Sequence, residues 1–525
     1  MNRRRVLSGA IAGASVSLLP ASLLHAGNAP SAIAKTRAGT VRGLFEDRVY
    51  SFKGVRYGAD TSNRRFLPPL APTSWSHVAE AFQYGASAPQ TGEKEATSED
   101  CLFLNVWTPG LRDGGKRPVM FYIHGGAYSH GSGSSPLYDG RRLCRRGDVV
   151  VVTVNHRLNA FGYLYLGRLV AGDALADSGN AGMLDLILAL QWVRDNAAEF
   201  GGDPDCVMLF GQSGGGAKIA TLMAMPGARG LFHRAATMSG QQVTASGPLH
   251  ATDRARALLA HLKLSDPNAL RTVPRDQLVG ALDIVDPIIG SGSLYFGPVL
   301  DDRGLPRHPF FPDAPQQSAN IPMIIGNTHD ETRLLIGAGD PTTFSLSWDE
   351  LPSRLATQMR ADISPERVVS EYRRLYPRYS PTEVFFAATT AGRSWRAAII
   401  EAELRAQQGS PAYAYQLDWK APKDGGKWGA PHTLDIPLVF DNIAVPDALT
   451  GSGPDAQRMA DQMSEAFISF ARTGNPNSRL LSGWEPYQLP RRQTMVFNNP
   501  SRLEDDPRGA ERRLFSSVPF VQQGT

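Results

Sequence analysis

The feature that most constrains the fold of this 525-residue chain is a glycine-rich turn around Ser213. An apolar run, Cys206–Phe210, precedes the turn, and a helix-prone segment, Ala217–Met223, follows it. A strand that turns tightly into a helix leaves the central side chain of the turn exposed at its apex. Glycines 211 and 215 indicate that strand and helix approach too closely there for side chains. Ser213 is therefore a candidate nucleophile, and the alternative is an ordinary strand-to-helix turn.

Short β-branched runs alternate with helical patterns along most of the chain, which predicts an α/β fold built on a mainly parallel sheet. Arg117–Ile123 and Asp148–Asn155 are the strongest candidate strands, and the second is apolar enough to be buried on both faces. Apolar residues recur at helical spacing from about Gly182 to Asn196, so we expect a core helix there. Gly39–Gly43 and Val49–Val55 are expected to form short antiparallel strands at an edge.

A second glycine-rich segment, His124–Gly133, follows the candidate strand that ends at Ile123. Backbone N–H groups in such a loop can point toward a substrate carbonyl, because no side chains block the approach. In esterases an oxyanion hole joins a loop of this kind to the residue after the nucleophile. A phosphate-binding loop is the alternative, but the segment lacks the GK[ST] sequence that such a loop requires.

Residues 1–34 are predicted to be an export signal. Arg3–Arg5 precede an uncharged, weakly apolar stretch, Ser8–Leu24, which is too weakly hydrophobic to span a membrane. Paired arginines ahead of a mild apolar region favour twin-arginine export in a bacterium, with cleavage near Ala26 or after Ala34. The alternative is a general secretory signal or a lipid-free anchor. In either case the body of the protein is expected in the periplasm or outside the cell.

Formal charge gives no reason to expect nucleic acid or an anionic membrane as a partner. Lys plus Arg exceeds Asp plus Glu by 54 − 50 = 4, and three of these arginines lie in the predicted signal. The 11 histidines show no HExxH motif, so neither a metal nor another cofactor is expected. Cys101, Cys144 and Cys206 are widely spaced and allow one disulfide at most, and Cys206 is expected to be a small core residue.

Several motifs together resemble the type B carboxylesterase and cholinesterase family. They occur in the family's order and at family-like spacing, and they cover nearly the whole chain after the signal: Ser98–Val106, His124–Gly126, Asn155–Leu158, Phe200–Pro204, Gly211–Gly215, Gly326–Glu331, Gly429–Asp435 and Phe470–Asn477. The resemblance implies an α/β-hydrolase fold in which large insertions surround a deep active-site gorge. It also implies that residues 35–525 form one domain.

The resemblance places a catalytic triad at Ser213, Glu331 and His432. A serine hydroxyl is a poor nucleophile until an imidazole accepts its proton, and a carboxylate holds that imidazole in the required tautomer. The order serine, acid, histidine along the chain is the order of α/β-hydrolases. Asp330 is the alternative acid, although the resemblance favours Glu331.

Three other histidines, His124, His130 and His329, compete with His432 for the role of base. We expect His124 to be a structural neighbour of the oxyanion loop and His329 to lie on a loop surface. His432 itself lies in a loop rich in glycine and proline after a candidate strand, Ala412–Leu417. Catalytic residues of α/β folds are commonly found on loops beyond strand ends.

The oxyanion hole implied by the resemblance consists of the N–H groups of Gly126, Ala127 and Gly214. Many relatives have glycine where Ala127 stands and alanine where Gly214 stands, and backbone donors survive both changes. The family's turn commonly has glutamate where Gln212 stands, and this difference removes no catalytic group.

The resemblance also predicts the state of one cysteine. Relatives usually pair the cysteine that matches Cys101 with another at the position of Ala88. Because that partner is missing here, Cys101 is expected to be a free thiol.

The sequence therefore predicts a cofactor-free, metal-free serine esterase that cleaves small-molecule esters through an acyl-enzyme. Hydrolysis of amides, thioesters or long-chain lipids is an alternative, because a triad does not determine the type of bond that is cleaved. A non-catalytic binding module is a further alternative, but such relatives usually lack a triad residue, and all three are present in this chain.

Overall fold

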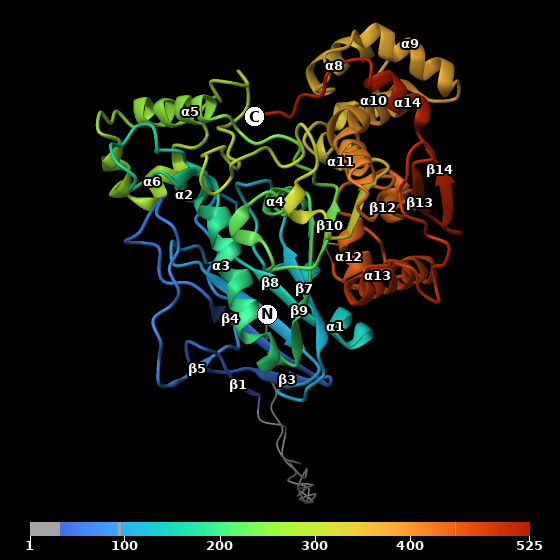
Figure 1. Cartoon of the computed structure of the whole chain (residues 1–525). Helices are drawn as coiled ribbons and strands as arrows, with labels where there is room; N and C mark the ends of the chain where they lie inside the picture. The colour runs from blue at the N-terminus through green and yellow to red at the C-terminus, as the bar shows by residue number, and fades with distance from the viewer. Residues whose placement is uncertain (1–31, 93–95, 447) are drawn as a thin grey trace, which may run out of the picture. The chain divides into compact units, whose positions relative to one another are not determined.

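The structure is a computed structural model that describes residues 32–92, 96–446 and 448–525. The predicted export signal lies outside the described residues except at 32–34. One large sheet forms the centre of the described chain, and Figure 1 shows helices on both of its sides. The strands of this sheet are β3 Leu44–Glu46, β4 Val49–Arg56, β6 Phe103–Thr108, β7 Arg117–Ile123, β8 Val150–Val154, β9 Gly202–Gln212, β10 Arg234–Met238, β11 Met323–Thr328, β12 Ala412–Leu417, β13 Gln493–Phe497 and β14 Arg502–Asp505.

The 11 strands are arranged in the order β14-β13-β12-β11-β10-β9-β7-β8-β6-β4-β3. From β13 to β8 every neighbouring pair is parallel, whereas the pairs at both ends of the sheet are antiparallel. Parallel neighbours need long crossover connections, which are usually helices packed on the faces of the sheet. The predicted α/β fold with a mainly parallel sheet is confirmed.

The helices provide these crossovers and the cover of both faces. They are α1 Arg141–Gly147, α2 Asn159–Tyr163, α3 Ala181–Asn196, α4 Gly214–Leu222, α5 Pro248–His261, α6 Arg275–Gly280, α7 Glu331–Leu335, α8 Leu351–Gln358, α9 Pro365–Leu375, α10 Pro381–Thr390, α11 Arg396–Gln407, α12 Asp435–Val439, α13 Pro454–Thr473 and α14 Gly509–Phe515. The core helix expected from the periodicity of its apolar residues is α3, which begins one residue earlier than predicted.

Two apolar cores lie on opposite faces of the sheet, because side chains alternate along a strand. In β7, Val119 and Phe121 belong to the core under α3 and α11, whereas Met120 and Tyr122 belong to the core under α1, α12 and α13. Both faces are therefore covered, which explains why the central strands are apolar almost throughout.

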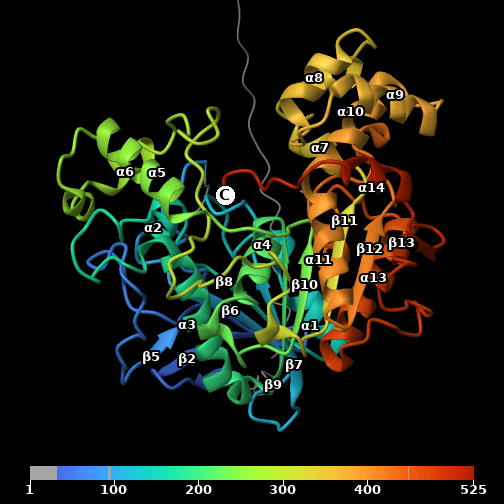
Figure 2. The same cartoon turned by 45° about the horizontal axis from the view of Figure 1, so that its top comes forward.

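A helical insertion connects β11 to β12 and has an apolar core of its own. Side chains from α8, α9 and α10 form this core together with α14 near the end of the chain. Figures 1 and 2 show α8, α9 and α10 grouped on one side of the described chain and α5 and α6 on the other, with the C-terminus between them. The two groups stand beyond the carboxyl ends of the parallel strands, where α/β folds bind their ligands.

The expected short antiparallel strands are present, although they belong to different sheets. Val49–Val55 lies in β4, which pairs antiparallel with β3 and β6 near the edge of the large sheet. Gly39–Gly43 contains β2 Thr40–Arg42, which pairs antiparallel with β1 Ile33–Lys35 in a separate three-stranded sheet that also includes β5 Val78–Glu80.

The prediction for Cys206 was wrong. Cys206 is partly exposed, and its thiol contacts the carbonyl oxygen of Ala471 at 3.4 Å instead of filling a core. All three cysteines of the chain are free, so the prediction of a free thiol at Cys101 is confirmed.

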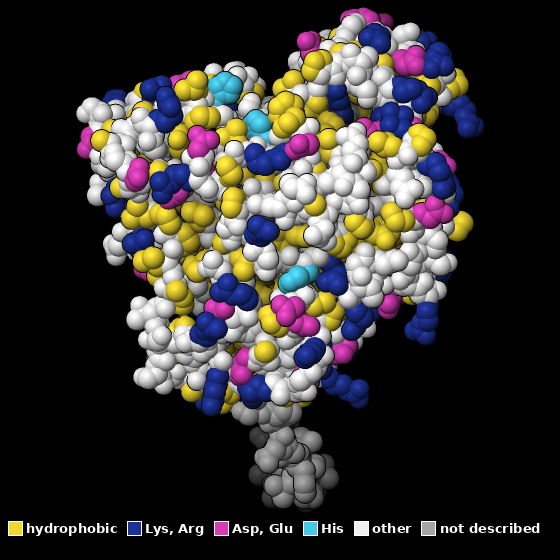
Figure 3. Space-filling model, in the orientation of Figure 1, with side chains coloured by type: hydrophobic (Ala, Val, Ile, Leu, Met, Phe, Trp, Pro, Cys, Tyr) yellow, Lys and Arg dark blue, Asp and Glu magenta, His cyan; other side chains and the backbone are white. Residues whose placement is uncertain are grey.

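Among the helices of the described residues, none is both long and apolar enough to cross a bilayer. On the face of the molecule seen in Figure 3, Lys and Arg side chains are spread among acidic and uncharged ones.

Candidate active site

Ser213 occupies the turn between β9 and α4, with φ 57° and ψ −128°, a conformation that L residues rarely adopt. Glycines 211 and 215 allow the backbones of β7, β9 and α4 to approach closely around this turn. A Cβ atom on Gly215 would overlap the carbonyl oxygen of Ile123 in β7, and one on Gly211 would lie 2.7 Å from the same oxygen. The predicted reason for glycine at both positions, a close approach of backbones, is confirmed.

Glu331 and His432 form a buried pair beyond the ends of β11 and β12. The Nδ1 atom of His432 is hydrogen-bonded to Oε2 of Glu331, which has no solvent exposure. The other carboxylate oxygen accepts hydrogen bonds from the N–H of Thr328 at 2.9 Å and from Nδ2 of Asn327 at 3.3 Å. The carboxylate is therefore fixed to β11 and holds the proton of His432 on Nδ1, which leaves Nε2 able to accept another.

Asp330, the alternative acid, makes different contacts. Its Oδ2 accepts the N–H of Ala430 at 2.9 Å, and its Oδ1 lies 3.3 Å from Nδ1 of His329 and 3.4 Å from Nε of Arg333. Burial opposes ionisation, but the hydrogen bond and charge of His329 outweigh it and hold the pKa of Asp330 well below its ordinary value. The prediction that His329 lies on a loop surface was wrong, because this side chain is half-buried against Asp330.

Ser213 and His432 line one cavity of about 290 Å³. Ala127 and Gly214, two of the predicted oxyanion-hole residues, also line it, and Gly126 adjoins Ala127 in the same loop. The remaining residues of the wall are Tyr128, Ala217, Ser239, Gly240, Gln241, Gln242, Tyr295, Leu335, Arg360, Gly392, Arg393, Ser394, Ala397 and Phe520–Gln523. The structure thus brings the candidate nucleophile, base and oxyanion donors to one cavity.

The three candidate oxyanion donors are free to bind a ligand. Within the described part of the chain, the N–H groups of Gly126, Ala127 and Gly214 donate to no backbone acceptor. Gly126 and Ala127 have positive φ angles of 83° and 51°. A Cβ atom on Gly214 would collide with the carbonyl oxygen of Ala127. Glycine at 214 is therefore required while the backbone of residue 127 keeps this position.

Lys218 holds the two halves of the candidate oxyanion hole together. Its Nζ donates to the carbonyl oxygen of Ala127 at 2.6 Å and to that of Gly214 at 3.3 Å, and it lies 4.9 Å from the ring centre of Tyr128. Burial without a carboxylate partner lowers the pKa of this amine to about 7. When charged, Lys218 places a cation directly behind the candidate oxyanion hole.

His124 and His156 form a buried stack beside Lys218, with ring centres 4.8 Å apart. Burial, and next the charge of Lys218, lower the pKa of each imidazole, to about 3 for His124. His124 is also hydrogen-bonded through Nδ1 to the carbonyl oxygen of Gly125. It is thus a neutral neighbour of the oxyanion loop, as predicted.

Gln212 packs on the candidate base. Its Nε2 lies 3.3 Å from Nδ1 and 3.2 Å from Nε2 of His432. A donor almost equally distant from both ring nitrogens cannot lie along either lone pair in the ring plane, so the amide lies over the face of the imidazole. Sequence reasoning missed this contact and that of Lys218, although a lysine in an apolar helix one turn after Ser213 was a visible signal.

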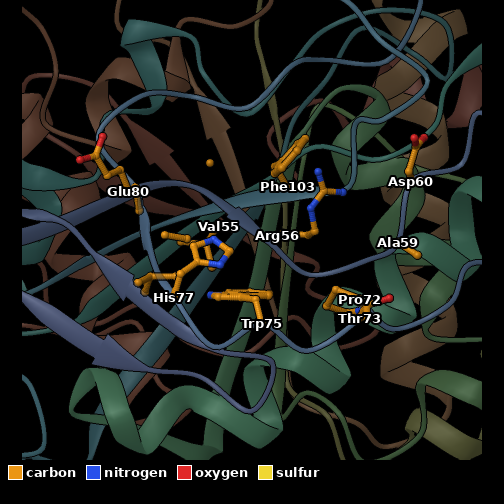
Figure 4. A pocket seen from close by; sticks show the side chains of 14 residues that line it. Val55, Arg56, Ala59, Asp60, Pro72, Thr73, Trp75, His77, Glu80 and Phe103 are labelled. Atoms are coloured by element: carbon orange, nitrogen blue, oxygen red, sulfur yellow. The ribbon is translucent and has the colours of Figure 1, made fainter.

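A larger cavity, of about 450 Å³, lies elsewhere and contains none of the predicted catalytic residues. Figure 4 shows Trp75, His77, Phe103 and Arg56 around it. The guanidinium of Arg56 lies 4.5 Å from the ring centre of Phe103 and is paired with Asp100. The charge of this arginine is thus already balanced within the protein, and the triad cavity is the better candidate for catalysis.

Comparisons with known proteins identify the family of the chain. A model of the carboxylesterase family matches residues 30–515. The chain is 34% identical over 505 residues to the para-nitrobenzyl esterase of Bacillus subtilis (strain 168), covering 92% of this chain and 99% of that protein. It is 35% identical over 482 residues to the phenmedipham hydrolase of Pseudarthrobacter oxydans, covering 87% and 93%.

Solved structures agree as well. A carboxylesterase of Geobacillus stearothermophilus superposes with a TM-score of 0.82 at 37% identity, covering 92% of this chain and 100% of the other. This neighbour shares the large, mainly parallel sheet flanked by helices. The chain therefore belongs to the carboxylesterase family and is a carboxylic ester hydrolase with the α/β-hydrolase fold.

Proposed function

We propose that the chain hydrolyses small carboxylic esters with Ser213 as nucleophile, His432 as general base and Glu331 as the acid that orients it. The observation that carries this proposal is the pairing of His432 with a fully buried Glu331 at the cavity that Ser213 lines. Nε2 of His432 takes the proton of Ser213 while Oγ attacks the ester carbonyl. Glu331 stabilises the imidazolium that forms, because its charge is fixed beside Nδ1.

The negative charge of the tetrahedral intermediate develops on the former carbonyl oxygen. The N–H groups of Gly126, Ala127 and Gly214 stabilise it, and the helix that begins at Gly214 adds a favourable dipole. His432 then donates its proton to the departing alcohol, which leaves an acyl-enzyme on Ser213. A water molecule attacks the acyl group, with His432 again as base, and releases the carboxylic acid.

The nucleophile is tested by Ser213→Ala. We expect kcat to fall by about 10⁴ to 10⁶, because the variant can form no acyl-enzyme. Ser394→Ala is the matched control, since Ser394 lines the same cavity away from the turn. Thermal melts of both variants verify folding. A Ser213→Ala enzyme with kcat within about tenfold of wild type contradicts the assignment.

Short esters suit this cavity better than long-chain lipids do. Its volume of about 290 Å³ is at the lower end of the range of small-ligand sites. Amide and thioester hydrolysis are the remaining alternatives, and a series of substrates that share one acyl group but differ in leaving group separates them from ester hydrolysis.

We also propose export to the periplasm or beyond, with cleavage upstream of the strand β1. Two positions were expected, near Ala26 and after Ala34. Ala34 lies within β1, has no solvent exposure and pairs with Val41, so cleavage after it would remove most of a strand. We therefore expect the mature protein to begin between Ala26 and Ile33. N-terminal sequencing of enzyme from a periplasmic fraction tests this, and an intact N-terminus in the cytoplasm refutes it.

A further inference from the structure

Two arginines, Arg360 and Arg393, line the cavity that contains Ser213 and His432. Both come from the helical insertion between β11 and β12. Arg360 lies between α8 and α9 and has a positive φ of 54°. Arg393 lies in a five-residue π-helix, Ala391–Trp395, that joins α10 to α11. Single-turn π-helices inside α-helices are frequent at functional sites.

Neither arginine has a carboxylate partner. Arg393 donates from Nε to the carbonyl oxygen of Gln358 at 3.1 Å and from Nη2 to its Oε1 at 2.8 Å, and both acceptors are neutral. Arg360 forms no hydrogen bond or ion pair with another described residue. Among the described residues, no aspartate or glutamate lines the cavity. The wall of the cavity thus has two positive charges and no negative one.

Arg360 is exposed and Arg393 is partly exposed, so both can be reached by a ligand that enters the cavity. The fully buried arginines of the described chain form hydrogen bonds within the protein, and Arg405, for example, donates to carbonyl oxygens. Arg157 is paired with Asp185 at 2.6 Å, and Arg254 is paired with Asp286 at 2.6 Å. Arg360 and Arg393 have no such carboxylate, so their N–H donors can bind an anion at the wall of the cavity. Burial, and next the charge of Arg360, lower the pKa of Arg393 to about 9, which indicates that the two guanidiniums lie near enough to repel each other. Both remain charged at neutral pH.

From this geometry we infer that the preferred substrates are esters that carry a free carboxylate, which binds to Arg360 and Arg393 while the ester group lies at Ser213. This inference rests on the proposed function of the triad and specifies its substrate class. The planar guanidinium is suited to a carboxylate, because its N–H donors match the two oxygens. Binding supplies the counter-charge that the wall of the cavity lacks.

The test compares two substrates that differ only in charge. One is the mono-4-nitrophenyl ester of glutaric acid, which has a free carboxylate, and the other is the 4-nitrophenyl ester of glutaramic acid, its neutral amide analogue. We expect wild-type kcat/KM to be about tenfold or more higher for the anionic ester, the size of effect that a charge-assisted hydrogen bond provides. Ser213→Ala measures the background, including attack by the substrate's own carboxylate.

The double variant Arg360→Gln/Arg393→Gln should lose this preference, so that the ratio of the two kcat/KM values falls to about 1. Its kcat/KM for the neutral ester should stay within about threefold of wild type. Arg378→Gln is the matched control, since Arg378 is an exposed arginine of the same insertion that does not line the cavity. It should keep the wild-type ratio.

Three results overturn the inference: a wild-type ratio near 1, an unchanged ratio in the double variant, or an equal loss for both esters. The last result would show that the arginines only support the fold of the insertion. Failure of the proposed triad gives a different pattern, in which Ser213→Ala retains activity toward the neutral ester.

Discussion

Asp330 and Glu331 are adjacent carboxylates with different surroundings. Which of them is the acid of the triad is the first question to test at the scale of single residues. Glu331 contacts His432, whereas Asp330 contacts His329, Arg333 and the backbone. If the carboxylate that orients the imidazole is neutralised, the imidazole loses both its preferred tautomer and the negative charge that stabilises its protonated form. We therefore expect Glu331→Gln to lower kcat by up to about 10⁴.

Asp330→Asn should cost far less in kcat, and KM in Glu331→Gln should change less than kcat, because the lost interaction strengthens mainly in the transition state. Steady-state kinetics of the two variants, each checked by a thermal melt, decide between them. If Asp330→Asn is the inactive variant, the acid of the triad must be reassigned.

Individual residues were predictable to different degrees. Ser213, Glu331 and His432 could be predicted because each lies in a recognisable sequence motif. Each motif follows a strand that an apolar run or an alternation of apolar and polar residues predicts. The roles of Gln212, Arg360 and Arg393 could not be read in this way. Their roles depend on which side chains face the same cavity. Packing between segments more than 100 residues apart determines this, and the periodicity of the sequence does not predict such packing.

At the scale of elements, α4 connects the nucleophile turn to the oxyanion loop through Lys218. This contact makes stability depend on pH. In the unfolded chain Lys218 keeps its proton up to the ordinary pKa of 10.5, whereas in the folded protein it loses the proton above about 7. Between these values the unfolded state binds more protons, so the free energy of unfolding rises with pH, by up to about 1 kcal/mol per pH unit. Below pH 7 both states are protonated, and this contribution is constant.

Lys218→Met removes this dependence. The difference in unfolding free energy between wild type and Lys218→Met should therefore shift in favour of wild type from pH 7 to pH 9 and stay constant from pH 5.5 to pH 6.5. Urea unfolding at these pH values measures it, with Lys423→Met, at an exposed site, as the control. A difference that does not vary with pH would mean that Lys218 stays in one protonation state throughout.

Elements were predicted well where one physical signal dominates. Strand β7 and helix α3 follow from an apolar run and from helical periodicity, and the structure reproduces them within a residue. The small sheet of β1, β2 and β5 was not predicted, because three-residue strands are too short for alternation to be distinctive. The third core, under α8 to α10, also needed the structure, since it includes α14 from the far end of the chain.

At the scale of the whole molecule, stability rests on the two cores that enclose the sheet and on no disulfide, since Cys101, Cys144 and Cys206 are all free. We expect the melting temperature of the mature protein to be the same with and without a reductant. Alkylation under denaturing, non-reducing conditions should modify all three thiols. A lower melting temperature in reductant, or a mapped peptide that links two cysteines, would contradict this.

The backbone of Ser213 has an evolutionary consequence. A residue with a side chain at φ 57° and ψ −128° costs the fold roughly 1 to 3 kcal/mol, and glycine would avoid most of this cost. A chain maintained only as a scaffold for binding would gain stability by replacing this serine, and drift would favour the change. The presence of serine in this unfavourable conformation, at the same cavity as a histidine paired with glutamate, therefore indicates selection for catalytic turnover.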